Sequence, residues 1–302
     1  MFQFTDWLYE SLKRNRNVIF GFSIIYVILY HSGYAALFGR GYIGVDIFLF
    51  LSAFGLCFSL NKHSLLHFYL RRLNRIYPLF VISNLVKWSI ERIQGVRIGV
   101  WDTICDITGL SFFGIGGTHL LWFIPSLMLL YIFTPLLYHI CTKYKNSAFY
   151  IISILSITVM LILRNIDWQY ACLISRIPIF TFGILYFIHK GDLHKLSLPF
   201  LLCIFLHELS LSNELKFATS NFYAPVLLPI LCYVIDNLLQ SKLINSLSWI
   251  GSKSLELFIG NGMVTEFMIY TGVQKYVYYV IANILWGLIF IGINKLLPSN
   301  KR

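Results

Sequence analysis

The chain has 302 residues, of which 58% are hydrophobic and only 12% are charged, and its mean hydropathy is +0.72. Because a soluble domain normally carries about 25% charged residues, this composition excludes a water-soluble globular protein. The net charge of +11 does not indicate nucleic-acid binding, since the basic residues lie in short clusters between apolar runs and form no single stripe.

The apolar runs have the length of membrane-spanning helices, because a bilayer core about 30 Å thick requires roughly 20 apolar residues per helix. We therefore predict an all-α, polytopic integral membrane protein, with residues 1–302 as a single domain. The longest polar stretch, 95–118, is rich in glycine and is predicted to be an outer loop, partly re-entrant. About ten spans are predicted, at residues 18–38, 41–60, 76–94, 119–140, 147–163, 170–188, 196–211, 219–239, 249–271 and 277–297.

The sidedness of these spans is predicted from lysine and arginine. With the N-terminus in the cytoplasm and the spans alternating, the inner segments hold 16 of the 24 basic residues and the outer segments hold 8. This excess obeys the positive-inside rule, so both termini are predicted to be cytoplasmic. The protein is accordingly expected to cross the inner (cytoplasmic) membrane of a cell many times.

The six cysteines indicate neither a metal site nor a disulfide framework. Four of them fall within or at the ends of apolar runs, and the chain has no CxxC motif. Only Cys105 and Cys172 are plausible disulfide partners. We therefore expect no metal.

Two ionisable residues lie inside the first two predicted spans. His31 precedes the short turn at 39–41 by eight residues and Asp46 follows it by five, so both sit roughly 8–12 Å below the outer end of neighbouring antiparallel helices. A carboxylate bonded to one imidazole nitrogen fixes the tautomer and leaves the other nitrogen as a base, which predicts a catalytic pair. Two alternatives stay open: His31 is a packed histidine, and Asp46 caps the second span or pairs with Arg40.

Three arginines lie in the inner segment 63–75, which is predicted to be a loop before the third span. Arg71, Arg72 and Arg75 are three to four residues apart, so on a helix they form one basic face. Pro78 is expected to disturb the start of the third span. The basic face is either ordinary positive-inside anchoring or an arginine fork for a phosphorylated cytoplasmic ligand.

Other polar residues within the spans are weaker candidates. Arg176 lies inside the outer third of the sixth span and needs a partner there. The second span carries many small residues, among them Ser52, and this pattern favours close helix packing. Charged residues near span ends, such as Asp236, are explained by solvation or by the helix dipole.

Five segments of the chain resemble membrane acyltransferase family three, over residues 20–260. Members show a histidine late in the first span, a G-x-x-G-V-D-x-F-F-x-x-S-G-F motif and an R-x-x-R-I-x-P segment. The matching runs here are YHSGYAALFGRGYIGVDIFLFLSAFGL (30–56), RRLNRIYPLF (71–80), HLLWFIPSLMLLYIFTPLL (119–137), RIPIFTFGILY (176–186) and WIGSKSLELF (249–258).

The resemblance implies transfer of an acyl group, expected to be acetyl, from cytoplasmic acyl-coenzyme A to a hydroxyl of a cell-envelope or exported polysaccharide or lipid-linked sugar. It implies His31 as the catalytic base beside Asp46. It also implies that Arg72 and Arg75, with Arg71, contact the phosphates of acetyl-coenzyme A. Further support is expected from Arg16, Arg176, Trp122, Ser52 and Asn261. The expected partners are the lipid bilayer, the glycan or lipid-linked sugar acceptor, and either a second copy of the chain or polysaccharide-assembly proteins.

The family pattern is incomplete in this chain. The arginine that members usually carry eleven residues before the histidine is Phe20 here, with Arg16 one helical turn lower on the same face. The usual S-G-F reads Ser52-Ala53-Phe54, and a late histidine is Asn261. A catalytically degenerate partner of an envelope complex is therefore one alternative. A transporter of polysaccharide or lipid-linked sugar is another, although the two halves show no inverted repeat.

Overall fold

The computed structural model describes residues 2–33, 40–117, 122–162, 167–190, 197–210, 215–216, 219–271 and 276–297. Within these residues the protein is all-helical, with 13 α-helices, two short 3₁₀ helices and no strand. The predicted all-α fold class is confirmed for this part of the chain.

Four of the described helices are long and apolar enough to cross a membrane, judged by length and composition. They are α4 (Tyr42–Lys62), α7 (Phe123–Tyr144), α9 (Trp168–Ile188) and α15 (Tyr276–Leu296). Three shorter apolar helices coincide with further predicted spans, namely α2 (Arg16–His31), α8 (Asn146–Ile162) and α10 (Ser197–Leu209). The number of spans and the cytoplasmic position of the termini stay predictions.

Large apolar side chains cover the outer faces of several of these helices. On α15, Ile281, Ile284, Leu285, Leu288 and Ile289 are all exposed. Soluble monomers rarely expose contiguous apolar faces of this kind, whereas lipid-facing helices require them. The exposed faces therefore support the multi-span membrane character expected from composition.

The chain groups into two compact units, and each is assembled from separate stretches of sequence. Unit 1 comprises Met1–Val27, Arg40–His63 and Leu130–Ser252. Unit 2 comprises Ile28–Gly39, Ser64–Leu129 and Lys253–Arg302. The single-domain assignment stays a prediction.

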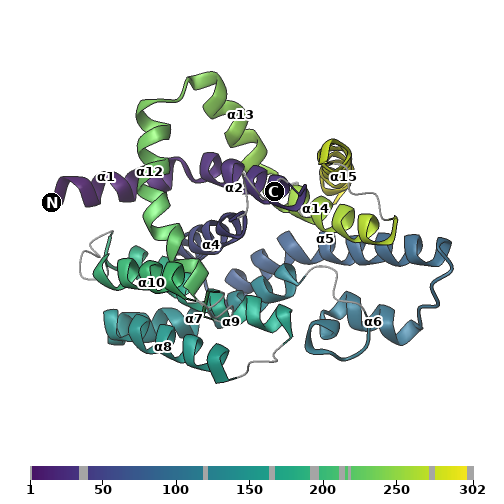
Figure 1. Cartoon of the computed structure of the whole chain (residues 1–302), viewed down its shortest axis with the longest axis horizontal. Coiled ribbons are helices and arrows are strands. Elements are labelled where there is room, and N and C mark those ends of the chain that lie inside the picture. The colour runs from purple at the N-terminus through teal and green to yellow at the C-terminus, as the bar shows by residue number, and fades with distance from the viewer. Residues whose placement is uncertain are drawn as a thin grey trace. The chain divides into compact units, whose positions relative to one another are not determined.

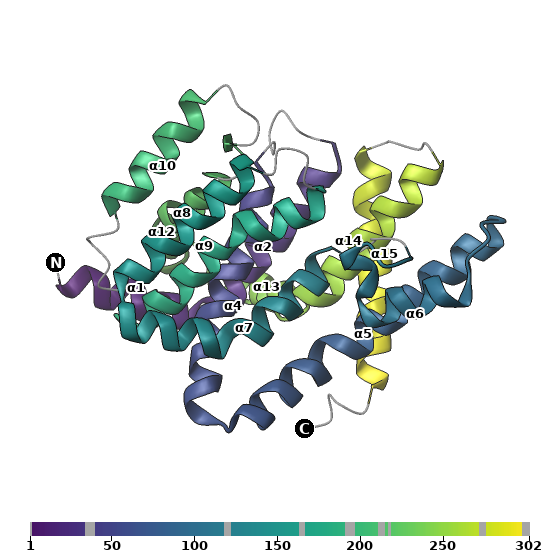
Figure 2. The same cartoon turned by 90° about the horizontal axis from the view of Figure 1, so that it is seen from below.

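The core of unit 1 lies between α4 and α9. The ring of Phe50 is 5.6 Å from the ring of Phe182 and equally far from that of Tyr186. A Cβ added to Gly183 of α9 would lie 2.5 Å from the carbonyl oxygen of Phe50, so only glycine permits this approach of the two backbones. On its other side α9 packs along α8 (Figure 2).

The N-terminal segment of unit 1 forms a helix that the apolar runs did not predict. This helix, α1 (Phe2–Arg14), is separated from α2 by Asn15 alone. It packs against α12 (Ala224–Asn237), which follows the short 3₁₀ helix η3 (Ser220–Tyr223) (Figure 1). Its amphipathic sequence buries Leu8 and Leu12.

The predicted ninth span is wrong as a single helix. Residues 249–271 belong to two helices, α13 (Ser241–Ser252) in unit 1 and α14 (Ser254–Thr271) in unit 2, with Lys253 between them. The polar stretch 251–254 interrupts the apolar run. Gly251 also packs tightly on the backbone of Asn17 in unit 1, which holds the end of α13 against α2.

Unit 2 contains an antiparallel helix pair, α14 and α15, which lie side by side (Figure 2). A Cβ added to Gly260 would lie 2.9 Å from the backbone nitrogen of Gly287. The two glycines therefore let these backbones approach closely, as small residues do in membrane helices. The first helix of the pair, α14, also contacts α5 (Leu65–Ile93).

The predicted loop at 63–75 is wrong, because α5 is one helix of 29 residues that continues through Pro78. Proline removes a single backbone hydrogen bond, and the adjoining turns of this helix are kept. At about 1.5 Å per residue the helix is roughly 43 Å long, which exceeds the roughly 30 Å bilayer core. Its first turns can therefore extend beyond the hydrocarbon and hold charged residues.

The predicted outer loop of unit 2 is folded. It contains α6 (Val100–Thr108) and the 3₁₀ helix η1 (Leu110–Phe113). The Asp102 carboxylate accepts hydrogen bonds from the backbone N–H groups of Gly117 (3.0 Å) and Gly99 (3.1 Å). Lys87 of α5 lies 3.5 Å from the carboxylate of Asp106 in α6, which joins the loop to the long helix.

Candidate functional site

His31 is the last residue of α2, and its side chain is exposed. Within unit 2 its ring nitrogen Nδ1 lies 3.0 Å from the amide nitrogen Nδ2 of Asn261. A polar partner for an imidazole determines the ring orientation and the tautomer. The structure thus joins two residues of the predicted site that are 230 positions apart in the sequence.

Asn261 is itself held by two hydroxyl groups. The Tyr279 hydroxyl donates to Asn261 Oδ1 at 2.9 Å, and it lies 2.6 Å from the hydroxyl of Thr265. The Thr265 hydroxyl donates to the backbone carbonyl of Asn261, one turn earlier in α14, at 2.8 Å. A continuous hydrogen-bonded chain therefore runs from Tyr279 through Asn261 to His31, and the Thr265 hydroxyl bonds the backbone of the same asparagine.

Asp46 lies in unit 1 and is fully buried in α4. Its carboxylate pairs with Arg176 of α9, with 3.0 Å between Asp46 Oδ1 and Arg176 Nε. Arg176 Nη1 also donates to the Cys172 carbonyl at 3.2 Å and to the Ser175 hydroxyl at 3.3 Å. The partner that Arg176 was expected to need is therefore Asp46.

The alternative roles for Asp46 are not observed. Arg40 pairs with Glu208 instead, at 2.8 Å. Asp46 is the fifth residue of α4, and the N-cap position is Gly41. The predicted catalytic pairing of His31 with Asp46 joins residues of different units, so it stays a prediction.

Arg16 begins α2 in unit 1, and its guanidinium lies 4.9 Å from the ring centroid of Phe20. The side chain thus reaches one turn up the helix, toward the position where the family arginine is usual. A Cβ added to Gly55 of α4 would lie 2.7 Å from Arg16 Nη2. Glycine at this position makes room for the guanidinium.

The three arginines of the segment 63–75, which is predicted to be cytoplasmic, lie on the first half of α5. Arg71 and Arg75 are exposed and one turn apart, while Arg72 is half-buried with its guanidinium 5.9 Å from the Phe68 ring. The helical spacing that a basic face requires is therefore present. The role of these arginines in binding acyl-coenzyme A stays a prediction.

Trp122 directly precedes α7 in unit 2. The next residue, Phe123, packs on Phe258 of α14 with 4.5 Å between the ring centroids. Phe258 is three residues before Asn261, so it is Phe123, the neighbour of Trp122, that packs on the helix that carries the amide. Ser52 is buried in α4 of unit 1. Their supporting roles stay predictions.

Tyr279 and Thr265 were not predicted as site residues. Thr265 follows Asn261 by four residues and so shares its helix face, but neither residue is charged. Only the packing of α15 on α14 brings the Tyr279 hydroxyl to the amide. Among the described residues, no group of three His, Cys, Asp or Glu side chains is arranged to hold a metal ion.

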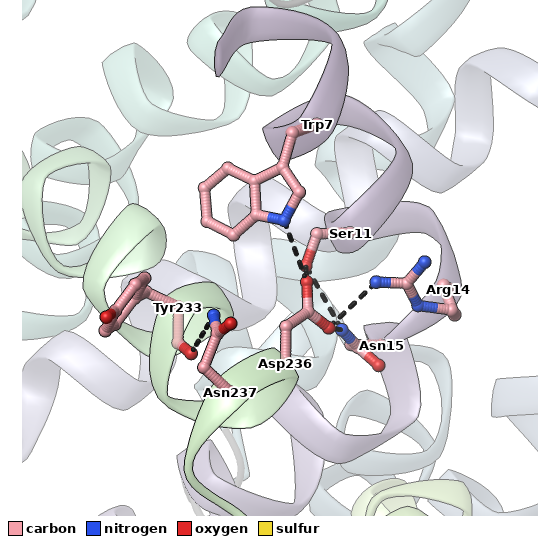
Figure 3. Close-up of polar contacts among 7 residues, drawn as sticks. All are labelled: Trp7, Ser11, Arg14, Asn15, Tyr233, Asp236 and Asn237. Atoms are coloured by element: carbon pink, nitrogen blue, oxygen red, sulfur yellow. Dashed lines mark hydrogen bonds and ion pairs between the residues drawn. The ribbon is translucent and has the colours of Figure 1, made fainter. Parts of the chain in front are cut away.

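A second polar cluster in unit 1 surrounds Asp236 at the end of α12 (Figure 3). Its Oδ2 atom accepts hydrogen bonds from Trp7 Nε1 (3.1 Å) and the Ser11 hydroxyl (2.8 Å). Its Oδ1 atom accepts from Arg14 Nη2 (2.8 Å) and Asn15 Nδ2 (2.7 Å). The carboxylate therefore binds one face of α1 and the residue between α1 and α2. Solvation or the helix dipole, expected for Asp236 from its place in the sequence, does not predict these contacts.

Comparison with known proteins identifies one family. A family model described as an acyltransferase domain, that of acyltransferase family 3, matches residues 18–294. Searches of curated proteins and of solved structures found no match. The match covers both the His31–Asn261 contact and the arginines of α5.

Proposed function

Because the chain belongs to acyltransferase family 3, we propose that it transfers an acyl group from cytoplasmic acyl-coenzyme A to a sugar hydroxyl. The expected donor is acetyl-coenzyme A. The expected acceptor is a cell-envelope or exported polysaccharide, or a lipid-linked sugar. The reaction takes place in the inner membrane, with the donor supplied from the cytoplasm.

The observation that carries this proposal is the polar chain that ends at His31. Polar groups are costly within apolar membrane helices, so a connected set of them is a functional candidate. Here an exposed imidazole is held by Asn261, which Tyr279 holds in turn. A positioned imidazole is the commonest general base in enzymes.

The chemistry requires one base and one activated donor. The imidazole of His31 takes the proton of the acceptor hydroxyl as its oxygen attacks the thioester carbonyl. A carbon–oxygen bond forms and the carbon–sulfur bond breaks, which releases the coenzyme A thiolate. The imidazolium then returns the proton to that thiolate, so the products are the O-acyl sugar and free coenzyme A.

Arginines supply the proposed donor contacts. Arg71, Arg72 and Arg75 present guanidinium groups along the first turns of α5, and guanidinium groups bind phosphates bidentately. The cytoplasmic position predicted for this segment matches the location of the donor. Arg16, stacked near Phe20 in unit 1, is proposed to take the place of the family arginine.

Transfer is tested with membranes from cells that produce the protein and from cells that lack its gene. Both are supplied with radiolabelled acetyl-coenzyme A, and label is measured in isolated surface glycan. The proposal predicts label only in membranes that contain the protein, and it predicts release of free coenzyme A in equal amount.

The same experiment separates the alternatives. A transporter moves glycan without an acyl donor, so its activity is insensitive to coenzyme A and no label is fixed. A degenerate partner leaves acetyl content unchanged when it is removed alone. Either result contradicts the proposed transfer.

A further inference from the structure

Asn261 occupies an unusual position for a buried amide. Its side chain is 3% exposed and lies between a titratable ring and a hydroxyl group. The amide nitrogen faces His31 Nδ1 and the amide oxygen faces the Tyr279 hydroxyl. An apolar side chain would fill this position equally well. A buried amide destabilises the fold unless its polar atoms are hydrogen-bonded.

An amide differs from a carboxylate because it has a donor end and an acceptor end. With the nitrogen toward His31, Nδ1 accepts a hydrogen bond, so the proton of the neutral ring is on Nε2. Rotation of the Asn261 side-chain amide by about 180° exchanges the positions of Nδ2 and Oδ1. The oxygen then accepts from an Nδ1–H group, and Nε2 is the nitrogen that exchanges protons with the substrate.

The Tyr279 hydroxyl is suited to both orientations. It donates to the amide oxygen in the first, and it accepts from the amide nitrogen in the second. In the second orientation the Tyr279 O–H donates to the Thr265 hydroxyl oxygen, which lies 2.6 Å away, and the Thr265 O–H donates to the Asn261 carbonyl. Every polar group of the chain is thus hydrogen-bonded in either arrangement.

We propose that Asn261 is the positioning residue of His31 and that its amide bonds the imidazole in both protonation states. This inference rests on the proposed function, in which the ring gains and then returns a proton. The base is the ring with the amide oxygen toward it: its proton is then on Nδ1, which donates to that oxygen, and Nε2 is free to take the proton of the acceptor hydroxyl. The same Nδ1–H bond holds the imidazolium. When Nε2 has given that proton to the thiolate, the neutral ring stays in place.

A neutral partner also suits the surroundings. A carboxylate at this position would add a charge to apolar helices, where each charge costs several kcal/mol. It would also hold the imidazolium more strongly than the neutral ring and so impede return of the proton. The amide orients the ring without either effect.

The test measures initial rates of acetyl transfer against donor concentration, per amount of protein in the membrane. Asn261→Leu is expected to lower kcat by on the order of 10- to 100-fold, the range known for the orienting partners of metal-bound histidines, and to leave the KM for acetyl-coenzyme A unchanged. Asn261→Asp, which keeps an acceptor toward the ring, is expected to recover part of kcat. If Asn261→Leu fails to reach the membrane, the smaller Asn261→Ser is measured in its place.

Asn294→Leu is the matched control. Asn294 belongs to the same helix pair, and its amide donates to Glu256 at 2.6 Å, so its loss also removes a hydrogen bond between α14 and α15. Asn294 lies fifteen residues beyond Tyr279 in α15, about four helical turns from the chain that ends at His31. The control is expected to keep the wild-type kcat.

Two results would overturn the inference. One is an equal fall of kcat in Asn261→Leu and Asn294→Leu, which would indicate a structural role only. The other is an unchanged kcat in Asn261→Leu while His31→Ala is inactive. Activity retained in His31→Ala would instead reject the proposed base, so the two failures are distinguishable.

Discussion

The ion pair of Asp46 and Arg176 is buried, and its burial determines why both charges are needed. Asp46 is 0% exposed and Arg176 is 3% exposed, so neither charge is stabilised by water. The pair is kept because each charge offsets the other, and because a backbone carbonyl and a hydroxyl group accept hydrogen bonds from Arg176 Nη1.

Removing one member of this pair should therefore be costly. We expect Asp46→Leu to lower the free energy of unfolding by about 3–5 kcal/mol, because it leaves a buried guanidinium unpaired. The double variant Asp46→Leu/Arg176→Met should recover most of this loss. Thermal unfolding of the purified protein in detergent measures both effects, and a double variant that is less stable than either single variant would contradict a mainly structural pair.

The Asp236 cluster acts at the scale of an element, because it attaches α1 to the rest of unit 1. Four donors from residues 7–15 converge on one carboxylate. Charge-assisted hydrogen bonds of this kind are about twice as strong as neutral ones. They also fix Asn15, where α1 ends and α2 begins.

Loss of this carboxylate should release α1. We expect Asp236→Leu to raise hydrogen exchange throughout residues 2–14, because a short helix with one buried face is unstable without its tertiary contacts. Mass spectrometry of exchanged peptides measures the change. Asp6→Leu, at an exposed position of the same helix, is the control and should leave exchange near the wild-type level, whereas unchanged exchange in Asp236→Leu would contradict the anchoring role.

The folded segment between α5 and α7, which is predicted to be an outer loop, should respond to acid through Asp102. The backbone N–H groups of Gly117 and Gly99 stabilise its carboxylate and hold the pKa of that carboxyl below its ordinary value. A lowered pKa stabilises the loop above the unfolded-state pKa, and the stabilisation is lost as pH falls through the folded-state pKa. Exchange protection of the Gly99 and Gly117 amides should thus persist at mildly acidic pH and disappear only below the usual aspartate range.

Asp102→Asn provides the comparison for this pH dependence. The amide has no carboxyl proton to gain, so protection should no longer vary across that acidic range. Exchange rates corrected for the intrinsic effect of pH measure both proteins. A variant that loses protection at the same pH as the wild type would show that another group is responsible.

Long apolar elements were predictable from sequence, and polar ones were not. The runs that became α4, α9 and α15 are recognisable because each is apolar over a membrane thickness. The helix α1 was missed because its stability depends on Asp236, more than 220 residues away. The loop predicted before Pro78 is helical because neighbouring turns compensate for one missing hydrogen bond.

The candidate site illustrates the same division. Residue counts predicted a common depth for His31 and Asp46, but depth does not determine which side of a helix a residue occupies. Asp46 forms an ion pair with Arg176, and the residue that contacts His31 is Asn261 of α14. Asn261 was suggested by the family pattern, while Tyr279 depends on helix packing that no local pattern contains.

At the scale of the whole molecule, the positive-inside distribution predicts the topology. Reporter fusions after Lys62 and Lys242 should show a cytoplasmic location, and a fusion after Arg97 should show an external one. Both ends of the chain should be cytoplasmic, since ten spans return it to the starting side. A cytoplasmic signal from the fusion after Arg97 would contradict this arrangement.

The central claim is that an imidazole within the membrane helices carries out acyl transfer. It is tested most directly by measuring label from acetyl-coenzyme A in surface glycan for His31→Ala, at equal abundance of the protein in the membrane. Loss of a general base typically lowers a rate by about 10²- to 10⁴-fold, so the account predicts that labelling falls to near background. Labelling at the wild-type rate would contradict it.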